Sequence, residues 1–174
     1  MYADRMDTFS ISAAFGGTTT IMPFVGSFRA WGGDGDALAA IDRFVEDALK
    51  SSLIDFGLHL ALVSQDMANL RNIVEGALDR GVSSFKVFMA YSRRGMKLED
   101  LEIMRVMQEV SHAGGLLMAH AENGAIIDFL IDRFLREGKT GPEFFAKSQP
   151  SLAEAEALFR VCTMASVVGC PLYI

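Results

Sequence analysis

Hydrophobic and polar positions follow two alternating patterns along the chain. Short runs rich in Val, Ile, Phe and Thr are separated by longer stretches in which apolar residues recur every three or four positions. The short runs are typical of strands, and the longer stretches are typical of amphipathic helices. Their alternation predicts an α/β fold built from repeated strand–helix units around a parallel sheet.

About five strand–helix units are predicted. The strands are expected at residues 18–25, 55–63, 83–91, 116–121 and 171–174. The helices are expected at residues 36–50, 66–80, 98–113, 123–137 and 151–168. Such a series suits either an open doubly wound sheet or a portion of a (β/α)8 TIM barrel. A complete barrel usually needs ~250 residues, so the barrel interpretation requires further strands.

Composition narrows the class of protein. The chain has 174 residues, 51% of them hydrophobic, and no linker or low-complexity segment, so residues 1–174 are predicted to form a single domain. A net charge of −6 without clustered Lys and Arg argues against a nucleic-acid partner. The longest mainly apolar stretch, residues 161–174, is too short to span a membrane. With two isolated cysteines and no signal-type N-terminus, a cytoplasmic protein is expected.

Lys86 is the most informative residue, because it interrupts a run that otherwise resembles a buried parallel strand. Burial favours the neutral amine, since removing an ammonium from water costs several kcal/mol. A neutral amine can react with carbon dioxide to give a carbamate, which is an anionic ligand able to bridge two divalent metals. The alternative is an edge strand on which the Lys86 side chain extends into water.

His120 ends the next predicted strand, where parallel folds place their functional sites. A neutral imidazole there suits zinc or a similar metal, whereas the alternative is a hydrogen-bonded histidine beside an Asn123 helix cap. Lys86 and His120 would point toward one site if both strands belong to the same barrel. Tyr91 lies five residues beyond Lys86 and would face the other way on an ideal strand, so it reaches this site only if the chain has left the strand.

The other two histidines have structural explanations. His59 lies within a predicted strand and is expected to be a core histidine, whereas His112 is placed near a helix C-terminus, where the helix dipole favours a partly cationic ring. Residues 32–36 are predicted to be a plain turn that leads into a helix. The sequence has no GxSxG, Walker or strand-following GxGxxG motif, so metal-assisted hydrolysis remains the favoured chemistry.

Two of these segments resemble those of a known enzyme family. Residues 83–91 (SSFKVFMAY) and 120–124 (HAENG) closely resemble the dihydropyrimidinase and D-hydantoinase family, which are cyclic amidohydrolases of the amidohydrolase superfamily. Further agreement in order and approximate spacing comes from residues 13–20 (AAFGGTTT), 54–59 (IDFGLH), 138–143 (GKTGPE) and 171–174 (PLYI). The resemblance covers essentially the whole chain.

The resemblance implies a (β/α)8 barrel with two divalent metal ions, usually zinc. The lysine matching Lys86 is carbamylated by carbon dioxide and bridges the metals, and the histidine matching His120 binds one of them. The tyrosine matching Tyr91 donates a hydrogen bond to the oxyanion that develops during hydrolysis of a cyclic amide. The implied substrates are dihydropyrimidines or 5-substituted hydantoins, which open to N-carbamoyl amino acids, and the family commonly forms homotetramers.

The sequence also departs from the family pattern. The family's HxH pair of metal ligands belongs to a strand ahead of the matching segments, and no HxH occurs in the chain. A further histidine ligand and a late metal-binding aspartate are expected beyond Ile174. The resemblance therefore implies a portion of the barrel, and it leaves open whether this isolated chain hydrolyses substrate.

Two other functions compete with a hydrolase. The first is a non-catalytic scaffold or interaction protein of the collapsin response mediator type, which shares the fold but lacks the metal-bridging lysine; the presence of Lys86 argues against it. The second is a small α/β binding domain with an open sheet, in which Lys86 and His120 are structural or bind an anion.

Overall fold

The computed structural model describes residues 4–28 and 33–174. The α-helices are α1 (Met6–Phe15), α2 (Ala37–Ser51), α3 (Leu70–Leu78), α4 (Asp100–His112), α5 (Gly124–Arg136), α6 (Phe145–Ser148) and α7 (Ser151–Val168). The strands are β1 (Thr20–Ile21), β2 (Phe24–Gly26), β3 (Asp55–Phe56), β4 (His59–Ala61), β5 (Ser84–Phe88), β6 (Leu116–His120) and β7 (Leu172–Tyr173). Short 3-10 helices lie at η2 (Ser64–Asn69), η3 (Ser92–Arg94) and η4 (Pro142–Phe144).

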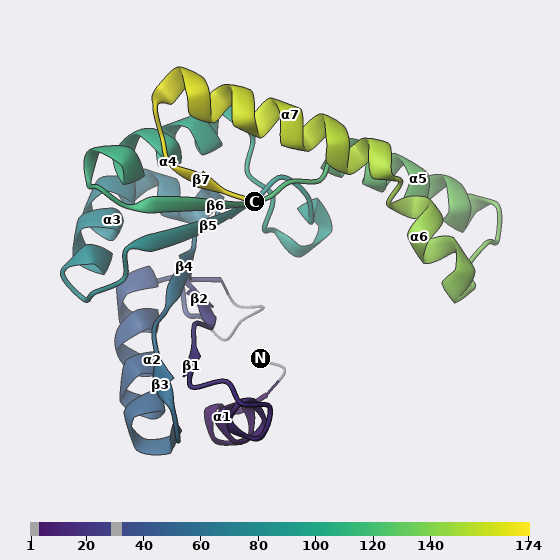
Figure 1. Ribbon diagram of the computed structural model, residues 1–174. Coiled ribbons are helices and arrows are strands. Elements are labelled where there is room, and N and C mark those ends of the chain that lie inside the picture. Colours follow the sequence, from purple (N-terminus) through teal and green to yellow (C-terminus); the bar gives the residue numbers. More distant parts are fainter. Residues whose placement is uncertain (1–3, 29–32) are drawn as a thin grey trace.

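Parallel strands form the centre of the molecule. β2, β4, β5, β6 and β7 make a sheet in that order, and β1 pairs separately with β3. Helices join the consecutive strands of the larger sheet, so the predicted α/β class with a parallel sheet is confirmed (Figure 1). No helix within the described ranges is long and apolar enough to cross a membrane.

The first two predicted strands are each interrupted once. The first appears as β1 and β2, and the second as β3 and β4, with an unchanged register across the interruption. Pro23 lies in the first gap and has no backbone N–H to donate to a sheet. Its carbonyl still accepts a hydrogen bond from the His59 N–H at 3.0 Å. Each pair is therefore one ladder with a local break.

The helices begin and end close to their predicted positions. Asp36 caps α2 by accepting a hydrogen bond from the Ala39 N–H at 3.0 Å, and Asn123 caps α5 in the same way with the Ile126 N–H at 3.1 Å. Residues 33–36 thus lead into a helix as predicted, whereas Gly32 lies outside the described residues. α1 and α6 were not predicted.

The main hydrophobic core lies between the sheet and one layer of helices. α2, α3, α4 and α7 cover this face, each packing against the next (Figure 1). The strand residues that face the helices are almost fully buried: Val25, Leu60, Phe85, Val87, Leu117 and Ala119. Burying each large apolar side chain contributes about 1.5–3 kcal/mol before the entropic cost of folding, so this layer holds the strands in place.

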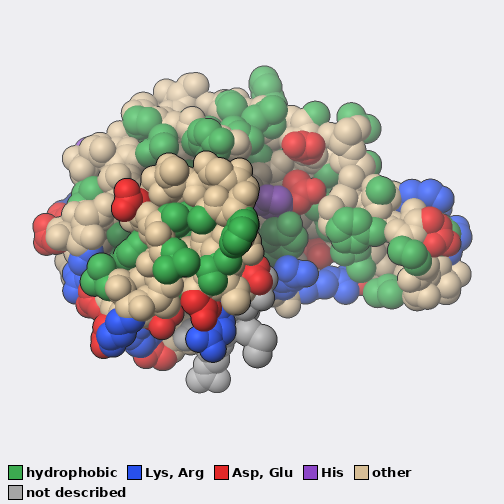
Figure 2. All heavy atoms as spheres, turned by 60° about the horizontal axis from the view of Figure 1, so that its bottom comes forward, with side chains coloured by type: hydrophobic (Ala, Val, Ile, Leu, Met, Phe, Trp, Pro, Cys, Tyr) green, Lys and Arg blue, Asp and Glu red, His purple; other side chains and the backbone are tan. Residues whose placement is uncertain are grey.

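The other face of the sheet, which we call the open face, carries His59, Ser84, Lys86, Phe88 and His120. These residues share one side because strand side chains alternate and because parallel pairs match in register. Phe88 is covered by a small cluster that includes Phe28 and Met96, whereas the two histidines and Lys86 are only partly buried. Figure 2 shows a hollow on this side of the molecule with a histidine at its base.

Candidate functional site

Lys86 lies at the middle of β5, between Ala61 of β4 and Met118 of β6. Its side chain is half-buried, and its Nζ lies 5.6 Å from the centre of the Phe88 ring. Within the described ranges the amine has no hydrogen-bond or ion-pair partner, and burial lowers the pKa of Lys86 below its ordinary value. An unpaired amine with a lowered pKa is more available as a nucleophile than an exposed lysine.

His120 is the last residue of β6 and pairs in register with Phe88, two positions beyond Lys86 on β5. Both side chains therefore project from the same face toward the carboxyl ends of the strands. The Nε2 atom of His120 lies 2.5 Å from Oε2 of Glu122. This nitrogen would have to leave Glu122 in order to bind a metal ion.

Tyr91 follows β5 and adopts a left-handed backbone conformation, with φ 69° and ψ 38°. This turn takes the chain out of the strand, and the Tyr91 ring stacks on the His120 ring with centroids 4.9 Å apart and planes 22° apart. Tyr91 therefore lies beside His120, although strict alternation from Lys86 would place it on the opposite face. Burial and the nearby Glu122 carboxylate raise the pKa of the Tyr91 phenol, which keeps it protonated as a hydrogen-bond donor.

His59 lies deeper in the sheet, opposite Ser84 on the open face. Its Nδ1 is 2.6 Å from the Ser84 hydroxyl, and its ring packs 5.0 Å from Phe24. Burial, followed by the positive charge of Lys86, lowers the pKa of His59. The ring is hydrogen-bonded and lies below the strand ends, as expected, but it lies on the open face and is only partly buried, so His59 is not part of the hydrophobic core.

Glu122 is the residue at this site to which sequence reasoning gave no role. It belongs to the HAENG segment, and its carboxylate contacts His120 and acts on the pKa of Tyr91. Its position two residues after His120 was the available signal, since residues at that spacing share a face in extended chain.

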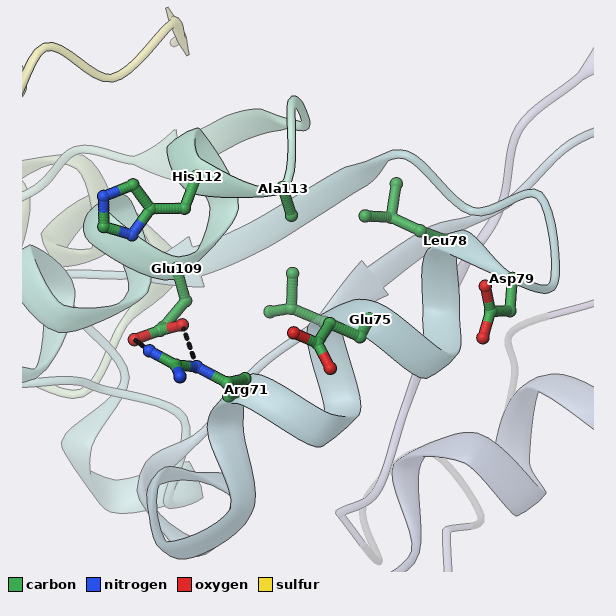
Figure 3. Close-up of a pocket in the computed structure, with 8 residues that line it drawn as sticks. Arg71, Glu75, Leu78, Asp79, Glu109, His112 and Ala113 are labelled. Atoms are coloured by element: carbon green, nitrogen blue, oxygen red, sulfur yellow. Dashed lines mark hydrogen bonds and ion pairs between the residues drawn. The ribbon is translucent and has the colours of Figure 1, made fainter.

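A separate surface pocket of about 300 Å³ lies between α3 and α4 (Figure 3). Its lining residues are Arg71, Val74, Glu75, Leu78, Asp79, Glu109, His112 and Ala113. Arg71 and Glu109 are paired across it at 3.0 Å. The pocket lies in the helix layer, away from the open face, and contains none of Lys86, Tyr91 and His120.

The donor set on the open face is small. No group of three or more His, Cys, Asp or Glu suitable for a metal ion occurs within residues 4–28 and 33–174. Lys86 does not belong to those residue types, and His120 and Glu122 make only a pair.

Known proteins match the chain over almost its whole length, although no family model matches it. It is 39% identical to a D-hydantoinase from Ralstonia pickettii, with 99% of this chain and 36% of the relative covered. It is also 39% identical to dihydropyrimidinase 2 from Caenorhabditis briggsae, covering 94% of this chain and 31% of that protein. The chain spans about a third of the length of these curated relatives.

Solved structures are similar to the chain over the same stretch as the relatives found by sequence. The crystal structure of dihydropyrimidinase from Brevibacillus agri NCHU1002 superimposes with a TM-score of 0.88 at 32% identity, covering 98% of this chain and 36% of that one. Similarity in sequence and in fold thus extends along the same stretch. The chain belongs, as a portion matching about a third of their length, to the family of D-hydantoinases and dihydropyrimidinases.

Proposed function

We propose that the chain forms part of the active site of a metal-dependent hydrolase that opens small cyclic amides, dihydropyrimidines or 5-substituted hydantoins, to N-carbamoyl amino acids. One observation carries this proposal: Lys86, half-buried and unpaired within the described residues, shares the open face with His120 and lies two positions before Phe88, which pairs with His120 where both strands end. Parallel α/β folds place catalytic groups at that end. The names of the relatives supply the reaction.

The single layer of helices supports a barrel arrangement. A doubly wound sheet carries helices on both faces, whereas here α2, α3, α4 and α7 cover one face only (Figure 1). In a (β/α)8 barrel the opposite face of the sheet turns inward. Residues 1–174 are accordingly proposed to be a single domain that forms a portion of such a barrel, with the HxH strand and the late strands lying outside these residues.

Lys86 and His120 are the proposed metal ligands. Attack of the Lys86 amine on carbon dioxide, with loss of a proton, would give a carbamate whose two oxygens can bridge two divalent ions, and zinc suits the mixed nitrogen and oxygen ligands. His120 would bind one ion through Nε2 after separating from Glu122. When bound, the metal pair would activate water and polarise the amide carbonyl.

Tyr91 is the proposed donor to the developing oxyanion. Its phenol stays protonated because its pKa is raised, and its ring is fixed against His120. A preorganised donor that strengthens its bond as charge develops lowers the activation barrier, and losing one such donor costs roughly 100-fold or more in kcat. The chain is also proposed to assemble as a homo-oligomer, a tetramer by analogy with the family.

The scaffold alternative is not favoured, because the chain retains Lys86 in a half-buried position that a scaffold does not require. A small anion-binding domain is disfavoured by the match to D-hydantoinases over 99% of the chain.

The decisive experiment adds ¹³C-labelled bicarbonate and zinc to the chain in mildly alkaline buffer and records its ¹³C NMR spectrum. A carbamate resonance is expected for the native chain and for the exposed-lysine control Lys50→Ala, and it should disappear in Lys86→Ala. Hydrolysis of dihydrouracil and hydantoin is assayed in parallel. Absence of a Lys86-dependent carbamate in a preparation that hydrolyses either substrate would refute the assigned role of Lys86.

A further inference from the structure

The backbone at Tyr91 needs external support. Among the described residues, Tyr91 is the only non-glycine residue with a positive φ. An aromatic side chain in the left-handed region is uncommon, and such a conformation persists only where the surrounding contacts hold it. Two amides, those of Arg94 and Met96, donate to the Tyr91 carbonyl, but these bonds lie within the turn itself.

Helix α5 contacts the turn from outside at its first residue. The Gly124 N–H donates to the Met89 carbonyl at 3.3 Å. A Cβ at Gly124 would lie 2.9 Å from the Met89 oxygen and 3.1 Å from the Ala90 Cα. Because both neighbours are backbone atoms, the helix touches the segment just before Tyr91 without an intervening side chain.

One helical turn later, α5 contacts the residues just after Tyr91. Asp128 accepts a hydrogen bond from the Ser92 hydroxyl, and its other oxygen accepts one from Arg93 Nε at 3.3 Å. Arg93 also donates through Nη2 to Asp132 at 2.5 Å. Helix α5 therefore contacts the chain on both sides of Tyr91. The contacts before Tyr91 are backbone packing, and those after Tyr91 are polar.

The Tyr91 side chain itself lies between helix α5 and the His120 ring. It packs beside a cluster of Ala90, Ile127 and Ala153, so one side of it faces α5 and α7. Its ring meanwhile stacks on His120. A shift of residues 92 and 93 away from α5 would move the ring relative to His120, because the left-handed turn links the two directly.

We propose that Ser92, Arg93 and Asp128, which we call the α5 clamp, are positioning residues that fix the Tyr91 ring against His120. The catalytic part of this inference rests on the proposed function, whereas its structural part does not. Partly exposed ion pairs add little to global stability. The effect of the clamp should therefore appear in the placement of Tyr91 rather than in unfolding.

The structural test uses the full chain and NMR contacts between the Tyr91 and His120 rings. We expect Asp128→Asn and Ser92→Ala to weaken or remove the ring–ring nuclear Overhauser effect. Glu137→Gln is the matched control, because it removes the carboxylate of the C-cap residue of α5, which pairs with Arg133 at 2.9 Å and with Lys139 at 2.6 Å, away from Tyr91. The control should keep the effect at a similar melting temperature. An unchanged effect in both clamp variants overturns the proposal.

The functional test measures hydrolysis of dihydrouracil and hydantoin with zinc and bicarbonate. Asp128→Asn should lower kcat roughly 10- to 100-fold with little change in KM, since small misplacements of a catalytic group cost this much. Asp128→Glu should recover part of the loss. If the native chain hydrolyses neither substrate but the ring contact depends on Asp128, the clamp stands and the proposed function fails. If hydrolysis persists unchanged when the contact is lost, the catalytic part of the inference is wrong.

Discussion

Lys86 on the open face differs from an ordinary surface lysine because its charged group is partly removed from water. Lys86 has no anionic partner within the described ranges, and its charge lowers the pKa of His59 in addition to the effect of burial. The His59 ring is held by Ser84 and Phe24, so it cannot easily turn toward solvent when it gains a proton. Its protonation should therefore be coupled to stability.

His59 makes the stability of the fold depend on pH. Because its folded pKa is lowered from 6.5, the unfolded chain binds a proton at a higher pH than the folded chain does. The contribution of His59 to stability is therefore fully present well above pH 6.5 and is lost as the pH falls through the lowered folded value. We expect His59→Asn to show a smaller drop in melting temperature on acidification than the native chain, as measured by circular dichroism.

Lys86→Met tests how far the charge of Lys86 contributes to the lowered pKa of His59, because it removes that positive charge. Its melting temperature should also decline less between neutral and mildly acidic pH, and His112→Asn serves as a control on the far end of α4. A decline in His59→Asn as steep as in the native chain would show that His59 does not contribute to the pH dependence.

The position of a helix in the fold depends on close backbone contacts as well as on its buried apolar face, and α5 is the clearest case. Gly124→Ala should destabilise the fold by about 1–3 kcal/mol, because its Cβ would meet backbone atoms that cannot yield without moving β5 or α5. Denaturant unfolding monitored by circular dichroism measures the change.

Gly76→Ala in α3 is the matched control. Its Cβ would lie 2.7 Å from Leu38 Cδ1, the end of a flexible side chain that can rotate away. Alanine also favours the helix over glycine by up to about 1 kcal/mol. This variant should be neutral or stabilising. Equal losses in the two variants would mean that the backbone contact at Gly124 has no special effect.

The elements that could be predicted are those marked by a pattern of apolar residues within their own segment of sequence. All five predicted strand regions and all five predicted helices were found, because the strand residues that face the helix layer, among them Phe85, Val87 and Leu117, are apolar and fully buried. α1 was missed because its apolar residues are not confined to one face; Phe9, Ile11 and Phe15 are all exposed. α6 has only four residues, which is too short for a period to be detected.

The candidate site was only partly predictable. Lys86 and His120 were identified because a charged or titratable residue stands out within or at the end of a strand. The position of Tyr91 depends on a left-handed turn that no local pattern indicated, whereas Glu122 was missed although its spacing of two residues from His120 was a usable signal. The clamp on α5 joins residues some 36 positions apart, so it is visible only in the folded chain.

At the scale of the whole molecule, several large apolar side chains on α7 and on the neighbouring edge strand β7 are exposed to solvent. On α7, Leu152, Phe159 and Val167 are each more than 70% exposed, and Tyr173 is 59% exposed on the outermost strand of the sheet. Exposed apolar patches and unpaired strand edges favour association. This surface agrees with the predicted homo-oligomer, but it also suits pairing with further strands of a barrel.

Light scattering after size exclusion should therefore show association that increases with protein concentration. Phe159→Lys should reduce it, because it places a charge at the centre of the exposed α7 surface. Leu49→Lys is the control, since Leu49 is 73% exposed on α2 at the opposite end of the helix layer. A monodisperse monomer at every concentration would contradict this expectation and would favour an independent binding domain.

The register that pairs Phe88 with His120 also limits how the sequence can change in length. One residue inserted within β6 would turn His120 toward the helices and bring an apolar neighbour to the open face, since side chains alternate. The same insertion in residues 137–144, which follow α5, would leave both strands and the turn at Tyr91 in place. Natural relatives should therefore vary in length in that segment, while the strands that carry Lys86 and His120 keep a constant length.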